Sequence, residues 1–140
     1  MELDFKKLDG LLPAVIQDAA TGEVLMLGFM NAEAYAATQA GGEVTFFSRS
    51  RNKLWRKGEQ SGHVLRVREI LVDCDVDSLL IRVDAVGPGV CHEGYRSCFF
   101  RQLSAGGEAK VVSERVFDPT VVYGRVRAPL GARAKKDAPR

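Results

Sequence analysis

The stretch from Asp73 to Cys98 constrains this chain more than any other, because it contains every cysteine and the most regular row of carboxylates. It reads DCDVDSLLIRVDAVGPGVCHEGYRSC, and its thiols belong to Cys74, Cys91 and Cys98, separated by steps of 17 and 7 residues. Soft sulfur ligands and hard oxygen ligands for metal ions are therefore interleaved in one short segment.

The cysteines point to a reducing compartment. An odd number leaves one thiol over in any set of disulfides, so a cytoplasmic protein is the simpler prediction. In that setting a thiol is either a small buried side chain or a metal ligand. Three thiolates with a fourth position open to water are typical of catalytic zinc, whereas structural zinc normally has four protein ligands. His63 or His92 as a fourth ligand would make the site structural, and the spacing leaves both alternatives open.

Asp73, Asp75 and Asp77 occupy alternate positions around Cys74. On an extended strand the three carboxylates would point to one face and the thiol to the other. Carboxylate oxygens suit Mg²⁺, and the alternative is an acidic turn in solvent. The alternation predicts two separate metal sites, with Cys74 meeting the other two cysteines of a second subunit.

The remaining pattern predicts an α+β fold that is mainly β. Apolar segments at residues 11–19 and 23–30 flank Ala20-Thr21-Gly22 and predict a hairpin. Asn31 is a good N-cap for a helix over 32–40, with Gly41-Gly42 as its stop and with Tyr35 and Ala36 facing inward. Further strands are predicted at 44–50, 65–73, 79–86, 98–103 and, more weakly, 111–117.

The 140 residues suit one domain, residues 1–117, followed by a flexible basic tail, residues 118–140, in which the apolar rhythm is lost. The longest apolar run near the start, residues 11–16, is interrupted by Pro13 and is far too short for a membrane span. It also lacks the flanks of a signal peptide. No membrane association is expected.

Residues 48–58, SRSRNKLWRKG, combine guanidinium groups, hydroxyls and the single Trp. Arginine binds phosphate through two parallel hydrogen bonds, and serine adds donors. Because the basic residues are confined to one stretch, a small phosphorylated ligand is favoured over nucleic acid. A solvated basic hairpin, or a nucleic-acid patch with Trp55 stacked on bases, is the alternative. The candidate ligand-binding residues are Ser48, Arg49, Ser50, Arg51, Trp55 and Lys57.

His63 and His92 are the only histidines, and His92 follows Cys91 directly. This position favours proton transfer or the orientation of a metal ligand. Cys91-x-Glu93 matches part of the zinc nucleoside-deaminase signature, but the partner motif P-C-x-x-C is absent.

The chain contains three longer motifs, SRSRNKLWRKGEQSGH, VDCDVDSLL and CHEGYRSCF. In their order and spacing they resemble the motifs of phosphoribosyl-AMP cyclohydrolase. This family comprises the hydrolase of histidine biosynthesis that opens the adenine ring of its substrate. The resemblance runs from about Asp9 to Leu103, with no phosphoribosyl-ATP pyrophosphohydrolase domain after it, so a monofunctional enzyme is expected. It implies a β-rich pseudobarrel capped by a helix, in an intertwined homodimer. It also implies zinc on Cys74, Cys91 and Cys98, shared between subunits, and magnesium on Asp73, Asp75 and Asp77.

The resemblance further implies the reaction. Zinc-hydroxide, available near neutral pH, would attack C6 of 1-(5-phosphoribosyl)-AMP and open the N1–C6 bond, giving the phosphoribosylformimino-AICAR phosphate intermediate. His92 or His63 would carry the proton to the departing nitrogen. Two alternatives stay open: a non-enzymatic phosphate or nucleic-acid binding module with structural zinc, and a zinc-dependent deaminase that releases ammonia.

Overall fold

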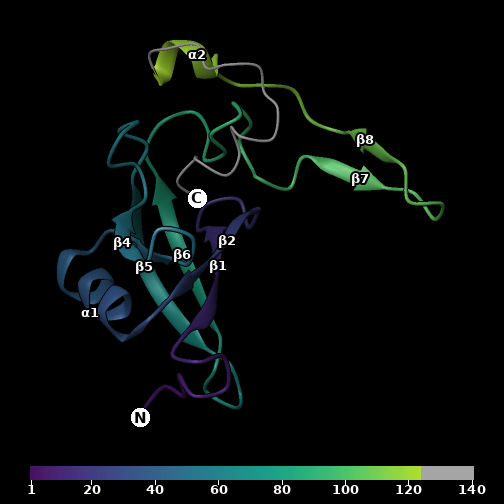
Figure 1. Cartoon of the computed structure of the whole chain (residues 1–140). Coiled ribbons are helices and arrows are strands. Elements are labelled where there is room, and N and C mark those ends of the chain that lie inside the picture. Colours follow the sequence, from purple (N-terminus) through teal and green to yellow (C-terminus); the bar gives the residue numbers. More distant parts are fainter. Residues whose placement is uncertain (124–140) are drawn as a thin grey trace.

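The main sheet has four strands in the order β2-β1-β6-β5 (Figure 1). The structure is a computed structural model that describes residues 1–123. The strands are β1 (Leu12–Asp18), β2 (Val24–Met30), β5 (Leu65–Val72) and β6 (Leu79–Ala85). β1 pairs antiparallel with β2 and parallel with β6, and β5 pairs antiparallel with β6. The predicted α+β, mainly β class is confirmed, and within residues 1–123 the strands form open sheets rather than a closed barrel.

The predicted N-terminal hairpin is confirmed as β1 and β2. Alternate residues of β1, from Leu12 to Ile16, are buried, and they lie beside the buried positions of β6 around Ile81. The imperfect alternation of the fifth strand has a physical cause, because the register of β5 shifts between Val67 and Glu69. This β-bulge moves the inward positions from odd to even residues and tightens the local twist.

Helix α1 (Ala32–Gly41) packs against β2 and against β3 (Thr45–Ser48), which pairs with β4 (Lys53–Arg56) in a second sheet. The Asn31 side chain accepts a hydrogen bond from the Ala34 N–H at 2.8 Å, and Gly42 ends the helix with φ of 74°. The predicted caps are therefore confirmed.

The predicted inward pair of α1 is wrong for Ala36, which is exposed, while Tyr35 is half-buried. Ala34 and Thr38 are the buried residues instead. The Thr38 hydroxyl bonds the carbonyls of Ala34 and Thr45, so this face of the helix lies on β3.

Beyond the sheet, β7 (Arg101–Leu103) and β8 (Ala109–Val111) form a two-stranded ribbon that extends away from the body (Figure 1). The strand predicted at 98–103 is thus shortened, and the one predicted at 111–117 is wrong, because a turn at Ser104–Gly107 pairs residues 109–111 with β7. We call residues 99–112 the arm.

The predicted tail, residues 118–140, begins with a short helix, α2 (Pro119–Val122). The rest of that prediction, residues 124–140, lies outside the described residues. None of the helices in residues 1–123 combines the length and the hydropathy needed to cross a membrane.

Candidate active site

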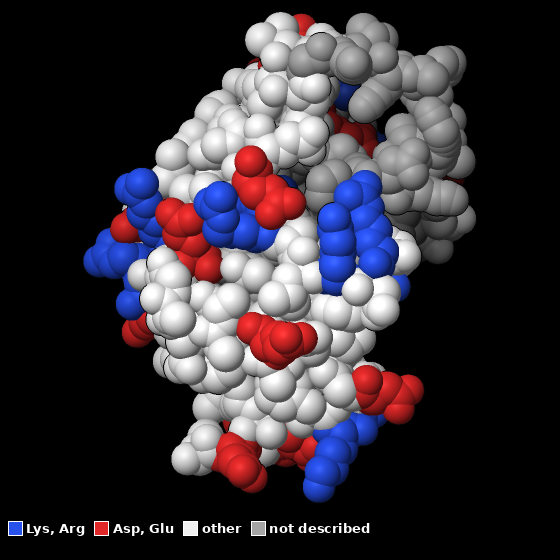
Figure 2. Space-filling view, turned by 60° about the vertical axis from the view of Figure 1, so that its left-hand side comes forward, with Lys and Arg blue, Asp and Glu red and all other residues white. Residues whose placement is uncertain are grey.

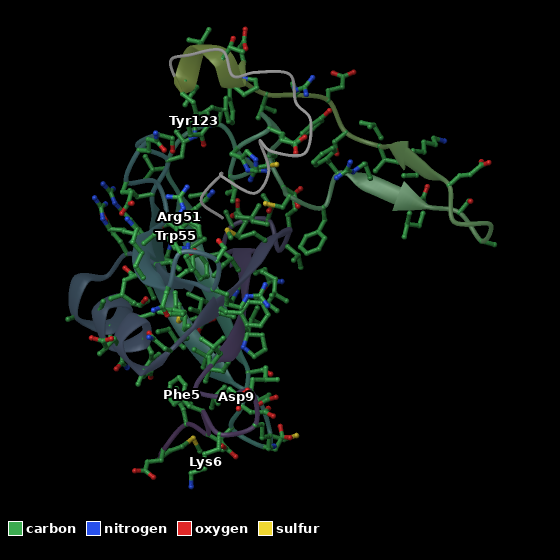
Figure 3. All side chains as sticks on the ribbon, viewed as in Figure 1. Phe5, Lys6, Asp9, Arg51, Trp55 and Tyr123 are labelled. Atoms are coloured by element: carbon green, nitrogen blue, oxygen red, sulfur yellow. The ribbon has the colours of Figure 1, made fainter. Side chains whose placement is uncertain are left out.

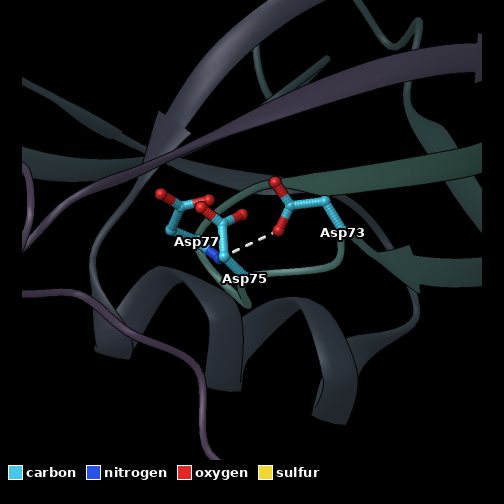
Figure 4. A group of neighbouring side chains, drawn as sticks. All are labelled: Asp73, Asp75 and Asp77. Atoms are coloured by element: carbon cyan, nitrogen blue, oxygen red, sulfur yellow. Dashed lines mark hydrogen bonds between the residues drawn. The ribbon is translucent and has the colours of Figure 1, made fainter.

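The three aspartates lie in the turn that joins β5 to β6, residues 73–78, which we call the aspartate turn. One carboxylate oxygen of Asp73 accepts hydrogen bonds from the Asp77 N–H at 3.0 Å and the Ser78 N–H at 3.1 Å. The backbone turns back at Val76, whose φ is +58°. Oxygens of Asp73, Asp75 and Asp77 consequently lie within 4.8 Å of one another (Figure 4). The predicted convergence is confirmed, but its predicted cause is wrong, because a turn rather than strand alternation gathers the carboxylates.

Lys7 contacts this turn, although it is 68 residues from Asp75 in the sequence. Its ammonium group lies 3.0 Å from an Asp75 oxygen and 3.1 Å from an Asp77 oxygen. Hydrogen bonds to these two carboxylates raise the pKa of Lys7. The N-terminal segment is held at the same place by a hydrogen bond of 2.7 Å from the Asp4 N–H to the Val76 carbonyl. No sequence pattern linked Lys7 to the turn.

Cys91 and Cys98 meet in the loop that follows β6, and we call them the thiol pair. Cys98 donates a hydrogen bond to Cys91, and this lowers the pKa of Cys91 to about 6 although burial acts in the opposite direction. The Glu93 N–H adds a second donor at 3.4 Å from the Cys91 sulfur. Thiolates are the form that binds zinc. The Cys98 N–H donates to the Leu25 carbonyl at 2.8 Å, which fixes the pair against β2.

Cys74 is exposed in the aspartate turn, at the end of β6 opposite to Cys91. The seven residues of β6 span roughly 20 Å at about 3.3 Å per residue, so Cys74 does not reach the thiol pair of its own chain. Within residues 1–123, the aspartates are the one group of three or more potential ligands whose atoms converge. Two separate locations are therefore present in the chain, and the sharing of zinc between subunits stays a prediction.

A cavity of about 490 Å³ opens between β2 and the β3–β4 hairpin, and we call it the large cavity. Its lining residues are Leu27, Gly28, Phe29, Phe47, Ser48, Arg49, Ser50 and Trp55. Four of the six candidate ligand-binding residues are thus brought together: Ser48, Arg49, Ser50 and Trp55. The Arg49 guanidinium lies 4.1 Å from the centre of the Phe29 ring. Arg51 lies outside this lining, exposed in the hairpin turn that Figure 3 shows beside Trp55.

Trp55 also lines a second hollow, of about 20 Å³, and we call it the small hollow. Its lining residues are Trp55, Lys57, Gly58, Glu59, Gln60, Ser61, His92 and Tyr123. Lys57 and His92, both candidates from the sequence, are therefore close together. Because Trp55 lines both spaces, the large cavity and the small hollow are neighbours.

His63 lines neither space and is packed into the loop after β6. Its Nδ1 lies 3.1 Å from the Gly89 carbonyl, and its ring meets the edge of Phe117 with centres 5.0 Å apart. A methyl group at Gly87 would lie 2.5 Å from the imidazole, so the backbone approaches the ring closely there. These contacts give His63 a packing role in this chain.

Tyr123 is a site residue that the sequence reasoning placed in the flexible tail. It lines the small hollow with His92, at the end of the molecule away from Phe5 and Lys6 (Figure 3). The signal was present in Asp118-Pro119, an N-cap residue followed by Pro at the first helical position.

The thiol pair, the separate carboxylate cluster and the cavity with hydroxyls and a guanidinium group are features of the class of metal-dependent enzymes, here on a mainly β scaffold. Residues 26–100 match the family model described as phosphoribosyl-AMP cyclohydrolase. A protein of that name from Solibacter usitatus is 61% identical over 124 residues, covering 89% of this chain and 98% of the relative. Those from Desulforapulum autotrophicum and Desulfatibacillum aliphaticivorans are 51% and 54% identical, each covering 88% of this chain and 98% of the relative. The chain therefore belongs to the phosphoribosyl-AMP cyclohydrolase family.

Proposed function

We propose that the chain catalyses hydrolytic opening of the N1–C6 bond of the adenine ring in 1-(5-phosphoribosyl)-AMP, in the cytoplasmic synthesis of histidine. The observation that carries this proposal, beside family membership, is the large cavity with Ser48, Arg49 and Ser50 at its wall. Its volume of about 490 Å³ suits a nucleotide-sized ligand. A guanidinium group and two hydroxyls are the donors that phosphate oxygens require.

The thiol pair is bonded to β2, the strand that also lines this cavity. The Leu25 carbonyl holds Cys98, and Leu27, two residues along β2 and roughly 7 Å away, lines the cavity. A substrate with its phosphate at Arg49 therefore extends past Trp55 toward Cys91 and His92. This arrangement separates a binding end from a reacting end.

The donor sets fit the two metals that the family implies. Cys91 and Cys98 offer the soft sulfur that zinc prefers, one of them with a lowered pKa, and the aspartate turn offers the oxygens that Mg²⁺ prefers. When bound, zinc lowers the pKa of a coordinated water to about 7, and magnesium offsets phosphate charge.

The chain's own residues perform the remaining tasks. Arg49 and the neighbouring hydroxyls hold the phosphate, and the edge of the buried Trp55 indole limits the position of the purine. His92, in the small hollow beside Cys91, is placed to transfer a proton to N1 as the ring opens. His63 is less suited to that role because it lines neither the large cavity nor the small hollow.

We infer that the enzyme acts as a homodimer in which Cys74 of one subunit completes the thiol pair of the other. The support is the strand of roughly 20 Å between these groups in one chain. The arm adds a second reason: Phe99 is 60% exposed and Leu103 70% exposed on a ribbon of two short strands. Such a ribbon is marginally stable alone and exposes unpaired strand edges, so a second copy is expected to cover it.

Among the residues that the structure describes, positive and negative side chains are interspersed on the face shown in Figure 2. These described residues form no continuous basic surface on that face, so they lend no support to the nucleic-acid alternative.

The decisive experiment combines the purified protein with zinc, Mg²⁺ and phosphoribosyl-AMP. Ring-opened product, followed by its absorbance, is expected without release of ammonia. Cys98→Ala should lose both zinc and activity, whereas Ser113→Ala, on an exposed serine, should retain them. Ammonia in place of the ring-opened product would identify a deaminase. Full zinc loading without turnover would indicate a binding module.

A further inference from the structure

The segment from Arg115 to Tyr123 folds back over the loop that carries the thiol pair, and we call it the strap. The N–H groups of Val116 and Phe117 both donate to the Gly94 carbonyl, at 2.7 and 3.3 Å. The Arg115 guanidinium donates to the Glu93 carbonyl at 2.8 Å. The strap is therefore bonded to the residues directly after Cys91 and His92.

The contact between the strap and the loop is close as well as hydrogen-bonded. Gly94 has a φ of +99°, and a methyl group there would lie 2.6 Å from the Phe117 carbonyl oxygen. A methyl group at Gly89 would lie 2.8 Å from a methyl of Val116. Only glycine permits this approach at Gly94, because other residues rarely adopt its backbone conformation.

Helix α2 then determines where the strap ends. The Asp118 carboxylate accepts hydrogen bonds from the Thr120 N–H at 3.0 Å and the Thr120 hydroxyl at 2.7 Å. The Tyr123 N–H donates to the Pro119 carbonyl at 3.0 Å. These bonds hold Tyr123 at the small hollow, which its side chain lines together with His92.

The Tyr123 side chain is half-buried in this position. Partial burial is the main cause that raises the pKa of Tyr123. Ser61, which interacts with the hydroxyl, acts in the opposite direction. The phenol is thus neutral at physiological pH and carries a proton that a substrate oxygen or nitrogen can accept.

We propose that Tyr123 contacts the substrate, its hydroxyl donating a hydrogen bond that positions the reacting purine or its ribose beside His92. The strap would then be a wall of the site rather than a tail. This inference rests on the proposed function, since it assumes that the substrate, bound in the large cavity, reaches past Trp55 to the mouth of the small hollow.

Tyr123→Phe tests the proposal because it keeps the aromatic ring and removes only the hydroxyl. We expect kcat/KM for phosphoribosyl-AMP to fall about tenfold, chiefly through a higher KM, with zinc content and Tm unchanged. Tyr35→Phe, on the half-buried tyrosine of α1, is the matched control and should leave kcat/KM within about twofold of the parent.

Two outcomes would overturn the proposal. Wild-type kcat/KM in Tyr123→Phe would show that the hydroxyl makes no substrate contact. A fall in activity together with lower Tm or zinc content would show that the residue only supports the thiol loop. Failure of the proposed function is a separate result, because the unaltered protein would then open no ring at all.

Discussion

Gly28 lies where the core meets the wall of the large cavity, and the packing there leaves no space for a side chain at this position. A methyl group there would lie 2.5 Å from two ring carbons of Phe46, which is only 1% exposed and packs against Trp55 with ring centres 5.2 Å apart. Gly28→Ala should therefore lower the free energy of unfolding by about 1–3 kcal/mol, because a buried ring has no free space to enter. Urea denaturation measures this loss.

Gly41→Ala is the matched control for that substitution. Gly41 ends α1 with open space around it, and replacing Gly by Ala in a helix is favourable by about 0.5–1 kcal/mol. A denaturation midpoint for Gly28→Ala equal to or above that of the parent would contradict the packing described for Phe46.

At the candidate site, the sequence predicted which residues come together where their chemistry is specific to their type. The three carboxylates converge in one turn, and Ser48, Arg49 and Ser50 line one cavity. Their roles as metal ligands and phosphate donors stay predictions. Lys7 and Tyr123 were missed because a common side chain acquires a role only through long-range contacts that no local spacing encodes.

At the scale of elements, Arg96 holds the loop that carries the thiol pair to the β1–β2 turn. Its guanidinium bonds Glu23 at 2.6 Å and also pairs with the buried Asp18, both at the β1–β2 turn. Arg96→Met leaves Asp18 without its cationic partner. It also removes the side-chain contact that holds the thiol loop to the β1–β2 turn, two residues before Cys98. We expect a loss of about 1–3 kcal/mol in stability and faster release of zinc to a chelator.

Arg68→Met provides the comparison, because Arg68 also forms an ion pair, with Asp84, but both partners are exposed and lie on strands β5 and β6 rather than on the thiol loop. This substitution should lower the free energy of unfolding by at most about 1 kcal/mol and leave the rate of zinc release unchanged. Equal rates of zinc release from the two variants would show that Arg96 does not anchor the thiol loop.

Elements were predictable where local signals are strong, as in the Asn31 cap and the N-terminal hairpin. The C-terminal elements were not. The pairing of 109–111 with β7 depends on where a turn forms, and neither strand gains an apolar face that would mark it. The alternate spacing of the three aspartates predicted a strand, but the same spacing in the sequence also occurs in a turn that brings the side chains together.

For the whole molecule, the length of β6 determines the distance between the two candidate metal sites of one chain. It sets Cys74 and the aspartate turn at one end and the thiol pair at the other. Three thiols can then surround one ion only if a second chain contributes Cys74, and by two-fold symmetry each dimer would contain two such sites. A mixed dimer tests this directly.

Cys74→Ser and Cys98→Ser should each be inactive alone, because each damages every site. When the two variants associate at random, about half of the dimers are mixed, and each mixed dimer holds one intact and one doubly damaged site. The mixture should therefore recover about one quarter of the activity of the unaltered protein, together with a proportional amount of bound zinc.

Mixing Cys91→Ser with Cys98→Ser is the control, since both substitutions damage the thiol pair that one chain supplies. Its mixed dimers contain no intact site and should stay inactive, although they form equally well. Full activity in Cys74→Ser alone would show that the thiol pair needs no third cysteine. Confirmed mixed dimers without recovered activity would place Cys74 outside the shared site, and the separation along β6 would then require another explanation.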